Sequence, residues 1–226
     1  MKKATLELIE KIKIDLKEML SEYRYNHSIG VMNKAIELAK IYGVDEDKAA
    51  LAGLTHDIAK DISNEEALKI IEKNNIELDE GEKMNTKLLH CPIGAFIVKE
   101  KYGLDEQIQN AIRYHAISYY KMDMLAKVTY IADKIEENRK SPSIIEEWRK
   151  VAFEDIDKAI IMHINFILEK KIEENGPIPT TTIETRNKLL MNKKWTHGNW
   201  WKLEIGTVLF SSRPNFQSIL SFLNII

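Results

Sequence analysis

The stretch that decides the fold is residues 45–60, DEDKAALAGLTHDIAK. Small apolar residues fill nearly every position from Ala49 to Leu54, which predicts a central helix surrounded by other helices. This helix ends in the adjacent pair His56-Asp57. Burying a carboxylate is costly unless it is paired or bound to a metal. Taken alone, the pair allows two interpretations: a salt bridge from Asp57 to Lys60, or a metal site.

The rest of the chain predicts an all-α fold. Apolar residues recur at helical spacing, and the 226 residues include only nine glycines and five prolines. Gly43 and Gly103 are expected to end helices, and residues 73–87 to form a loop. We find no clear strand pattern before residue 180. Helices are expected over residues 4–20, 27–42, 45–60, 63–72, 92–102, 105–115, 122–138 and 143–174.

Composition and charge argue against several classes of protein. The 33 basic and 35 acidic residues give a net charge of -2, so we expect no nucleic-acid partner, although a small basic pocket for a phosphorylated ligand is compatible. The single cysteine, Cys91, favours a reducing, cytoplasmic location, and we interpret it as a packing residue rather than a thiol ligand or nucleophile. The sequence shows neither a signal-peptide pattern nor an apolar run of the roughly 20 residues that cross a bilayer, so no membrane partner is expected.

A change in composition near residue 194 predicts two parts, a domain over residues 1–194 and an extension over 195–226. The extension holds three of the four tryptophans and only three charged residues. Residues 200–210 have the propensity of a strand. The extension is expected to pack on the domain or to remain loose; a membrane-touching or oligomerising role is the alternative.

Four residues occur in an order that gives His56-Asp57 a chemical meaning. His27 opens a helix 29 residues before His56, and Asp133 lies in the otherwise apolar stretch 128–135. The order His, His-Asp, Asp is that of the HD superfamily of metal-dependent phosphohydrolases, which the chain resembles. Imidazole nitrogen and carboxylate oxygen together suit divalent Fe, Mn, Ni or Zn.

Two further histidines, His90 and His115, lie between His56 and Asp133 and would complete a second metal site with Asp57. Two adjacent metals can produce a hydroxide nucleophile at neutral pH. Each histidine has a simpler explanation when taken singly. His90 can make a hydrogen bond at a helix start, and a histidine at a helix end, such as His115, is favoured by the helix dipole. His163 and His197 fall outside the pattern and are interpreted as structural or surface residues.

From Tyr23 to about Leu190 the chain resembles the bacterial YqeK family, HD-domain enzymes that split diadenosine tetraphosphate symmetrically into two ADP. The motifs that carry the resemblance are RYNHSIGV at 24–31, HDIAK at 56–60, LHCPIGA at 89–95, AIRYH at 111–115, IADKIEENR at 131–139 and TIETRN at 182–187. The resemblance implies an HD-domain helical bundle with a two-metal site in its centre, a nucleotide substrate and a homodimer.

The resemblance also implies roles for individual residues. One metal ion, expected to be iron, would be held by His27, His56, Asp57 and Asp133, and a second by Asp57, His90 and His115. Asp57, Lys60 and His90 are the expected catalytic residues. Arg24, Lys60 and Arg139 would neutralise the polyphosphate, since arginine offers a planar fork and lysine a point charge. The full set of expected substrate contacts is Arg24, Asp57, Ile58, Ala59, Lys60, His90, His115, Ala116, Asp133, Arg139, Pro177, Ile178, Pro179 and Thr180.

The chain departs from the family pattern in two places. Ala116-Ile117-Ser118 replaces a Thr-Thr-Gly run, which removes hydroxyls near the second metal, and Glu137 stands where a proline is common. An altered rate or substrate preference is therefore compatible with the sequence. Two alternatives remain at this stage: an HD phosphohydrolase acting on another nucleotide, and a catalytically weak nucleotide-binding protein.

Overall fold

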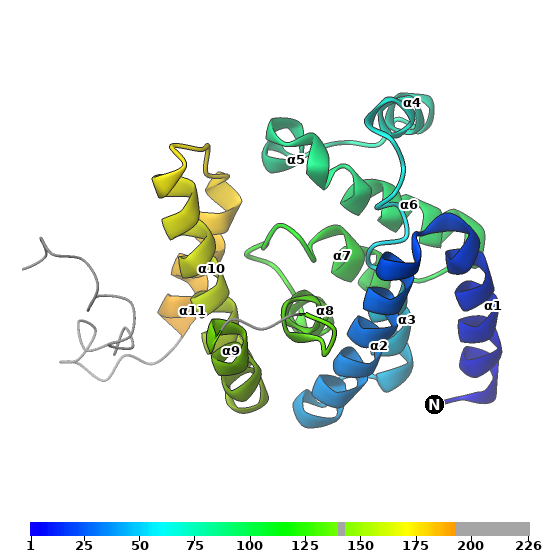
Figure 1. The fold of residues 1–226 in the computed structure, drawn as a ribbon, viewed down its shortest axis with the longest axis horizontal. Helices are drawn as coiled ribbons and strands as arrows, with labels where there is room; N and C mark the ends of the chain where they lie inside the picture. The colour runs from blue at the N-terminus through cyan, green and yellow to red at the C-terminus, as the bar shows by residue number, and fades with distance from the viewer. Residues whose placement is uncertain (140–142, 193–226) are drawn as a thin grey trace, which may run out of the picture. The chain divides into compact units, whose positions relative to one another are not determined.

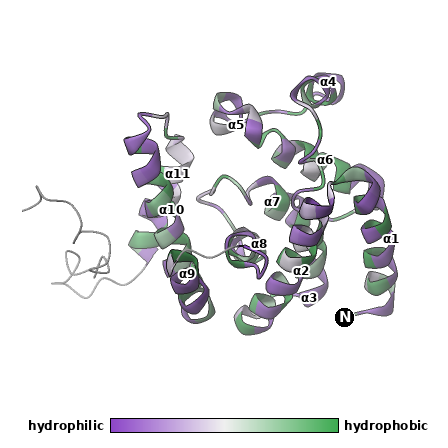
Figure 2. Cartoon of the chain, in the orientation of Figure 1, coloured by the Kyte–Doolittle hydropathy of each residue, from purple (hydrophilic) through white to green (hydrophobic). Residues whose placement is uncertain are grey.

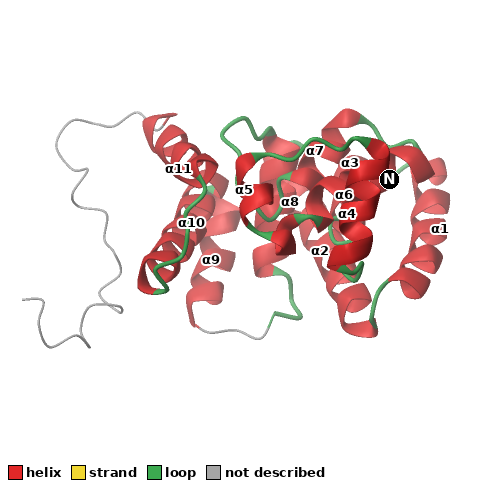
Figure 3. Cartoon of the chain, turned by 90° about the horizontal axis from the view of Figure 1, so that it is seen from above, coloured by secondary structure: helices red, strands yellow, loops and turns green. Residues whose placement is uncertain are grey.

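The computed structural model describes residues 1–139 and 143–192. Within these ranges the chain forms eleven α-helices and one short 3-10 helix, with no strand, which confirms the predicted all-α class (Figures 1 and 3). The elements are α1 (Lys3–Met19), α2 (Glu22–Tyr42), α3 (Glu46–Thr55), α4 (Asn64–Asn74), α5 (Glu80–Met84), η1 (Thr86–Leu88), α6 (His90–Tyr102), α7 (Glu106–Arg113), α8 (Met124–Ile135), α9 (Ser143–Glu154), α10 (Ile156–Glu173) and α11 (Thr180–Asn192).

Local sequence signals fix most helix ends. The Asp45 carboxylate accepts hydrogen bonds from two backbone N–H groups in the first turn of α3, and the Ser63 hydroxyl accepts one, from the Glu66 N–H, at the start of α4. Gly43 and Gly103 end α2 and α6 in the left-handed conformation that favours glycine. Figure 2 shows hydrophobic and hydrophilic residues interleaved along α1, as expected for an amphipathic helix.

Several predictions of local structure need correction. The helix that His27 was expected to open begins earlier, at Glu22, and the helix expected over 45–60 ends at Thr55. The loop expected over 73–87 contains α5 and η1, and α5 begins with a capping box in which the Asp79 and Glu82 side chains bind each other's backbone N–H. The helix expected over 143–174 is divided at Asp155, whose extended backbone and capping carboxylate start α10. Helix α11 was not predicted from the sequence. Residues 140–142, between the helices expected over 122–138 and 143–174, lie outside the described residues.

Helix α3 lies at the centre of the bundle and packs against α1, α2, α7 and α8. Its contact with α2 is close, because a Cβ atom on Gly53 would lie 2.9 Å from the Met32 Cα atom and 3.0 Å from the Val31 carbonyl oxygen. Only glycine permits this approach without a backbone shift. The close contact brings the C-terminal end of α3 beside the N-terminal half of α2.

Helix α8 also contacts α2 and α3, and its other side packs on α9 and α10. His163 of α10 is buried there. Its Nδ1 atom accepts a hydrogen bond from the Tyr130 hydroxyl at 2.8 Å, and the Trp148 ring meets its imidazole edge to face. These contacts agree with a structural role for His163.

The chain divides into two units, Met1–Leu190 and Met191–Ile226. The predicted boundary after residue 194, the strand predicted at 200–210 and the interpretation of His197 concern residues outside the described part. None of the helices in residues 1–139 and 143–192 combines the length and apolar character needed to cross a membrane.

Candidate metal centre

Five helices bring the six predicted metal ligands together. His27 lies in the second turn of α2, and His56 and Asp57 follow α3 directly. The other three come from the start of α6, the end of α7 and the last turn of α8. All six side chains are buried, with no more than 5% of any residue exposed: His27, His56, Asp57, His90, His115 and Asp133.

The first cluster lies between α2, α3 and α8. The His27 Nε2 atom is 3.0 Å from the Asp133 Oδ1 atom and 3.2 Å from His56 Nε2. His56 Nε2 is in turn 3.8 Å from Asp133 Oδ1 and 3.6 Å from Asp57 Oδ2. Four potential ligand atoms therefore face one another across a few ångströms.

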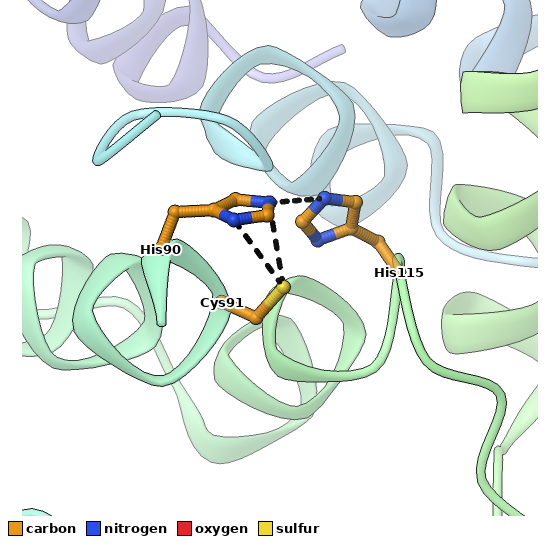
Figure 4. Close-up of side chains that lie close together, drawn as sticks. All are labelled: His90, Cys91 and His115. Carbon is orange, nitrogen blue, oxygen red and sulfur yellow. Dashed lines mark hydrogen bonds between the residues drawn. The ribbon is translucent and has the colours of Figure 1, made fainter. Parts of the chain in front are cut away.

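The second cluster uses the other oxygen of the same aspartate. Asp57 Oδ1 lies 3.2 Å from His90 Nε2 and 3.4 Å from His115 Nε2, and these two nitrogens are 3.3 Å apart (Figure 4). Asp57 thus directs Oδ2 to the first cluster and Oδ1 to the second. A carboxylate placed in this way can bridge two metal ions.

Every histidine of the two clusters turns Nε2 inward because its Nδ1 atom is already bound. Three of them bind the backbone carbonyl three residues earlier: His56 to Gly53 at 2.8 Å, His90 to Lys87 at 2.7 Å and His115 to Ile112 at 2.6 Å. A carbonyl only accepts, so the proton is on Nδ1 and the lone pair on Nε2 in the neutral ring.

His27 has the same arrangement, with the Glu136 carboxylate 3.0 Å from its Nδ1 atom. Inward lone pairs, backed by a carbonyl or a carboxylate, are the usual arrangement of histidines that bind a metal. The donor set therefore fits divalent cations, and it is a better fit to transition metals than to Mg²⁺ or Ca²⁺.

The protonation states of the carboxylates support this fit. Burial by itself would raise the pKa of Asp57, but the hydrogen bonds from His115 and His90 and the charge of His115 hold that pKa well below its ordinary value. Burial likewise acts to raise the pKa of Asp133, and Lys134 and His27 outweigh it. Both carboxylates are therefore ionised, as metal ligands must be.

The histidines differ in the metal-free protein. Complete burial lowers the pKa of His56 to about 3, which keeps that ring neutral. Burial also opposes the charged form of His115, but its neighbours Cys91 and Asp57 raise its pKa to about 10. A bound cation would favour the neutral form of His115, since the cation then replaces the proton as the partner of Asp57.

Three cations surround the clusters at partly exposed positions. Arg24 Nη1 lies 3.2 Å from Asp57 Oδ2, and Lys60 Nζ lies 3.0 Å from His90 Nε2 and 3.7 Å from Asp57 Oδ1. Arg139 Nη2 donates to Asp133 Oδ1 at 2.6 Å. About a quarter to a third of each side chain is exposed (32%, 26% and 35% for Arg24, Lys60 and Arg139). Lys60 therefore does lie near Asp57, as the salt-bridge interpretation of His56-Asp57 required. It is, however, only one of several groups around this carboxylate.

The remaining predicted substrate residues lie in two places. Ile58 and Ala59 are buried in the turn after Asp57, and Ala116, half-buried, follows His115. In the loop before α11, Pro177 is exposed, whereas Ile178 and Pro179 are half-buried.

The end of this loop contacts α5. The Thr180 hydroxyl donates to Glu80 Oε2 at 3.0 Å, and a Cβ atom on Gly81 would lie 3.3 Å from Pro179 Cβ and 2.9 Å from Ile117 Cδ1. The loop thus lies beside α5, close to the segment that follows His115. Its contact with substrate stays a prediction.

Two residues at the site were not predicted to act there. Glu136 backs His27, and the only clue in the sequence is its place one helical turn after Asp133. Cys91, interpreted from the sequence as a packing residue, is buried with its Sγ atom 3.4 Å from His90 Nε2 (Figure 4). His90, Cys91 and His115 form one of the residue groups able to hold a metal ion.

An all-helical bundle with adjoining histidine–carboxylate clusters on its central helices defines a class of metal-dependent phosphohydrolases. Residues 24–138 match the HD domain family, and the chain belongs to that family. Membership implies that it binds divalent metal, as predicted.

Relatives extend the likeness over most of the chain. A Bacillus subtilis protein named symmetrical bis(5'-nucleosyl)-tetraphosphatase is 40% identical over 179 residues, 77% of this chain and 94% of the relative. A Halalkalibacterium halodurans protein of the same name is 37% identical over 180 residues, covering 79% and 95%. A crystal structure of a predicted HD superfamily hydrolase involved in NAD metabolism, from Clostridium acetobutylicum, superposes with a TM-score of 0.77 at 39% identity, covering 81% of this chain and 97% of that one.

Proposed function

We propose that this protein hydrolyses diadenosine tetraphosphate symmetrically, so that water adds across the central P–O–P bridge and two ADP molecules leave. The observation that carries the proposal is the pair of clusters that share Asp57, with Arg24, Lys60 and Arg139 around them. The names of two relatives that align over nearly their whole length agree with the activity predicted from the sequence.

The metals and the cations would have separate tasks. When bound, divalent ions in the two clusters would polarise a phosphoryl oxygen and lower the pKa of a water molecule. His27, His56, Asp57 and Asp133 would hold one ion, and Asp57, His90 and His115 the other. We infer iron as the native metal because the family resemblance implies it; the mixture of imidazole and carboxylate ligands would equally accept Mn, Ni or Zn.

Arg24, Lys60 and Arg139 would bind the phosphate oxygens on either side of the bond that breaks. Each now forms an ion pair or hydrogen bond with a cluster residue, so each is held close to the reacting centre. Charge that develops on the transferring phosphoryl group and on the leaving ADP is stabilised by such preorganised cations. Asp57, Lys60 and His90 are the proposed catalytic residues, and Pro177–Thr180 is the proposed nucleotide-contacting loop.

Chromatography of the products tests the proposal. Protein purified anaerobically and assayed for bound iron is incubated with diadenosine tetraphosphate, and ADP is expected as the only product. Lys60→Ala should slow the reaction, whereas Lys99→Ala, at an exposed position of α6, should not. AMP plus ATP would contradict symmetrical cleavage, and turnover of mononucleotides alone would favour another nucleotide as the substrate. Bound nucleotide without turnover at any metal loading would favour the non-catalytic alternative.

Three further parts of the proposal concern the whole molecule. We propose a homodimer, testable by sedimentation, and a cytoplasmic location, which agrees with the single cysteine. We also propose that residues 1–194 form the catalytic domain. A chain shortened after residue 194 should then keep its metal content and its rate of hydrolysis.

A further inference from the structure

Glu136 is a buried carboxylate that does not belong to either proposed ligand set. It follows the last residue of α8, and only 1% of it is exposed. Its Oε1 atom accepts the hydrogen bond from His27 Nδ1 at 3.0 Å, and its Oε2 atom accepts from the Asn138 backbone N–H at 2.6 Å. Both oxygens are therefore held in place, one of them against a proposed metal ligand.

This contact makes His27 different from the other three histidines. His56, His90 and His115 donate from Nδ1 to a neutral carbonyl of their own chain segment, three residues earlier. His27 donates to a charged group 109 residues away in the sequence. Hydrogen bonds to an ionised acceptor are stronger, and a carboxylate behind an imidazole raises its basicity as a metal ligand.

Gly30 makes room for the contact from the opposite side. It lies on α2 one turn after His27, and a Cβ atom at this position would be 2.3 Å from Glu136 Oε2 and 3.0 Å from Asn138 Nδ2. Even the smallest side chain would therefore push the carboxylate out of its present place. Gly30 on α2 and Glu136 just after α8 thus form one packing unit behind His27.

We propose that Glu136 is a positioning residue that fixes the tautomer and direction of His27, and that Gly30 provides the space this requires. The result concerns one of the two metal sites: the support from Glu136 strengthens metal binding at the site that contains His27. The inference rests on the proposed metal dependence of the activity, but it concerns metal affinity and can be tested without substrate.

The test is calorimetric titration of the full-length, metal-free protein with Mn²⁺, in the parent background and in His115→Ala, which leaves only the first site intact. Glu136→Ala is expected to weaken binding at that site by about 10–100-fold, the usual effect of removing a group that supports a metal ligand. Glu136→Gln, which keeps an acceptor for His27, should fall between this variant and the parent. Glu137→Gln is the matched control, because this exposed neighbour pairs with Lys34 instead.

Gly30→Ala tests the same contact without changing the acid. It should weaken the first site as Glu136→Ala does, and the two changes combined should be much less than additive. Unchanged Mn²⁺ affinity in both variants, with or without a lower Tm, would overturn the proposal and leave Glu136 a structural residue. If the affinities change as expected but the parent does not cleave diadenosine tetraphosphate, the proposed substrate is wrong and the role of Glu136 stands.

Discussion

His163 should make the stability of this protein depend on pH independently of the metal centre. Burial lowers the pKa of His163 well below its ordinary value of 6.5, and the nearby charge of Lys134 acts in the same direction. The neutral ring accepts a hydrogen bond from Tyr130, and the charged ring could not. A histidine whose pKa is lower in the folded state contributes its full stability above pH 6.5. That contribution is lost as pH falls from 6.5 toward the folded-state pKa.

The size of the effect follows from this single group. If the folded protein does not protonate His163 above pH 5, the unfolded state gains about 2 kcal/mol between pH 7.5 and pH 5, from 1.36 kcal/mol per pKa unit. For a domain of this size the loss corresponds to a Tm about 4–8 °C lower.

The assay is thermal unfolding of the parent and of His163→Asn across this pH range, in the presence of a chelator so that metal release does not contribute. Asparagine keeps an acceptor near the Tyr130 hydroxyl but does not titrate. The variant is expected to be less stable at pH 7.5, because it is smaller, and to lose about 2 kcal/mol less on acidification. Every other titrating group is common to both proteins. Equal losses in the two proteins would refute the reasoning.

Three more expectations follow from the geometry. Asp57→Asn should weaken both metal sites, whereas Asp133→Asn should weaken only the first. Elemental analysis after dialysis should therefore find fewer tightly bound ions per chain in Asp57→Asn than in Asp133→Asn. Equal losses in the two variants would argue against a shared Asp57. A chelator should lower the Tm, and added Mn²⁺ should restore it. Free Mn²⁺ at 100 times its dissociation constant stabilises the folded state by about 2.7 kcal/mol per site. A Tm that does not respond to metal would contradict a metal centre at these residues. Gly53→Ala should cost about 1–3 kcal/mol in urea unfolding, because its Cβ atom would meet the Met32 backbone at 2.9 Å, and an unchanged midpoint would mean that α2 and α3 can separate freely.

The sequence was informative where the relevant interactions are local. Helix periodicity and small residues around His56-Asp57 predicted a central helix, and α3 has that position. The glycines that end helices, Gly43 and Gly103, were recognisable because each acts within one turn. The interruption at Asp155 was missed, since its capping side chain stands between two stretches that share a helical pattern.

The same distinction between local and long-range interactions applies to the candidate site. The predicted ligands do lie together. The prediction came from their order in the sequence, because the sequence gives no information about contacts between them. Glu136 was missed because its role depends on a contact with His27 on another helix, and helical spacing gives no sign of that contact. The position of Cys91 beside both histidines was not evident for a similar reason. Its neighbour His90 was evident, but the approach of both to His115 depends on how α6 and α7 pack.

The contact between α2 and the end of α8 has a consequence for chain topology. A metal ion held by His27 and Asp133 would tie together two points more than 100 residues apart, whereas the second site spans fewer than 60, from Asp57 to His115. In the loop-entropy description of cross-links, closing a loop of about 100 residues restricts the unfolded chain by about 4.7 kcal/mol. A metal ion bound by His27 and Asp133 would therefore act as a reversible cross-link between α2 and α8, much as a disulfide does in a secreted protein.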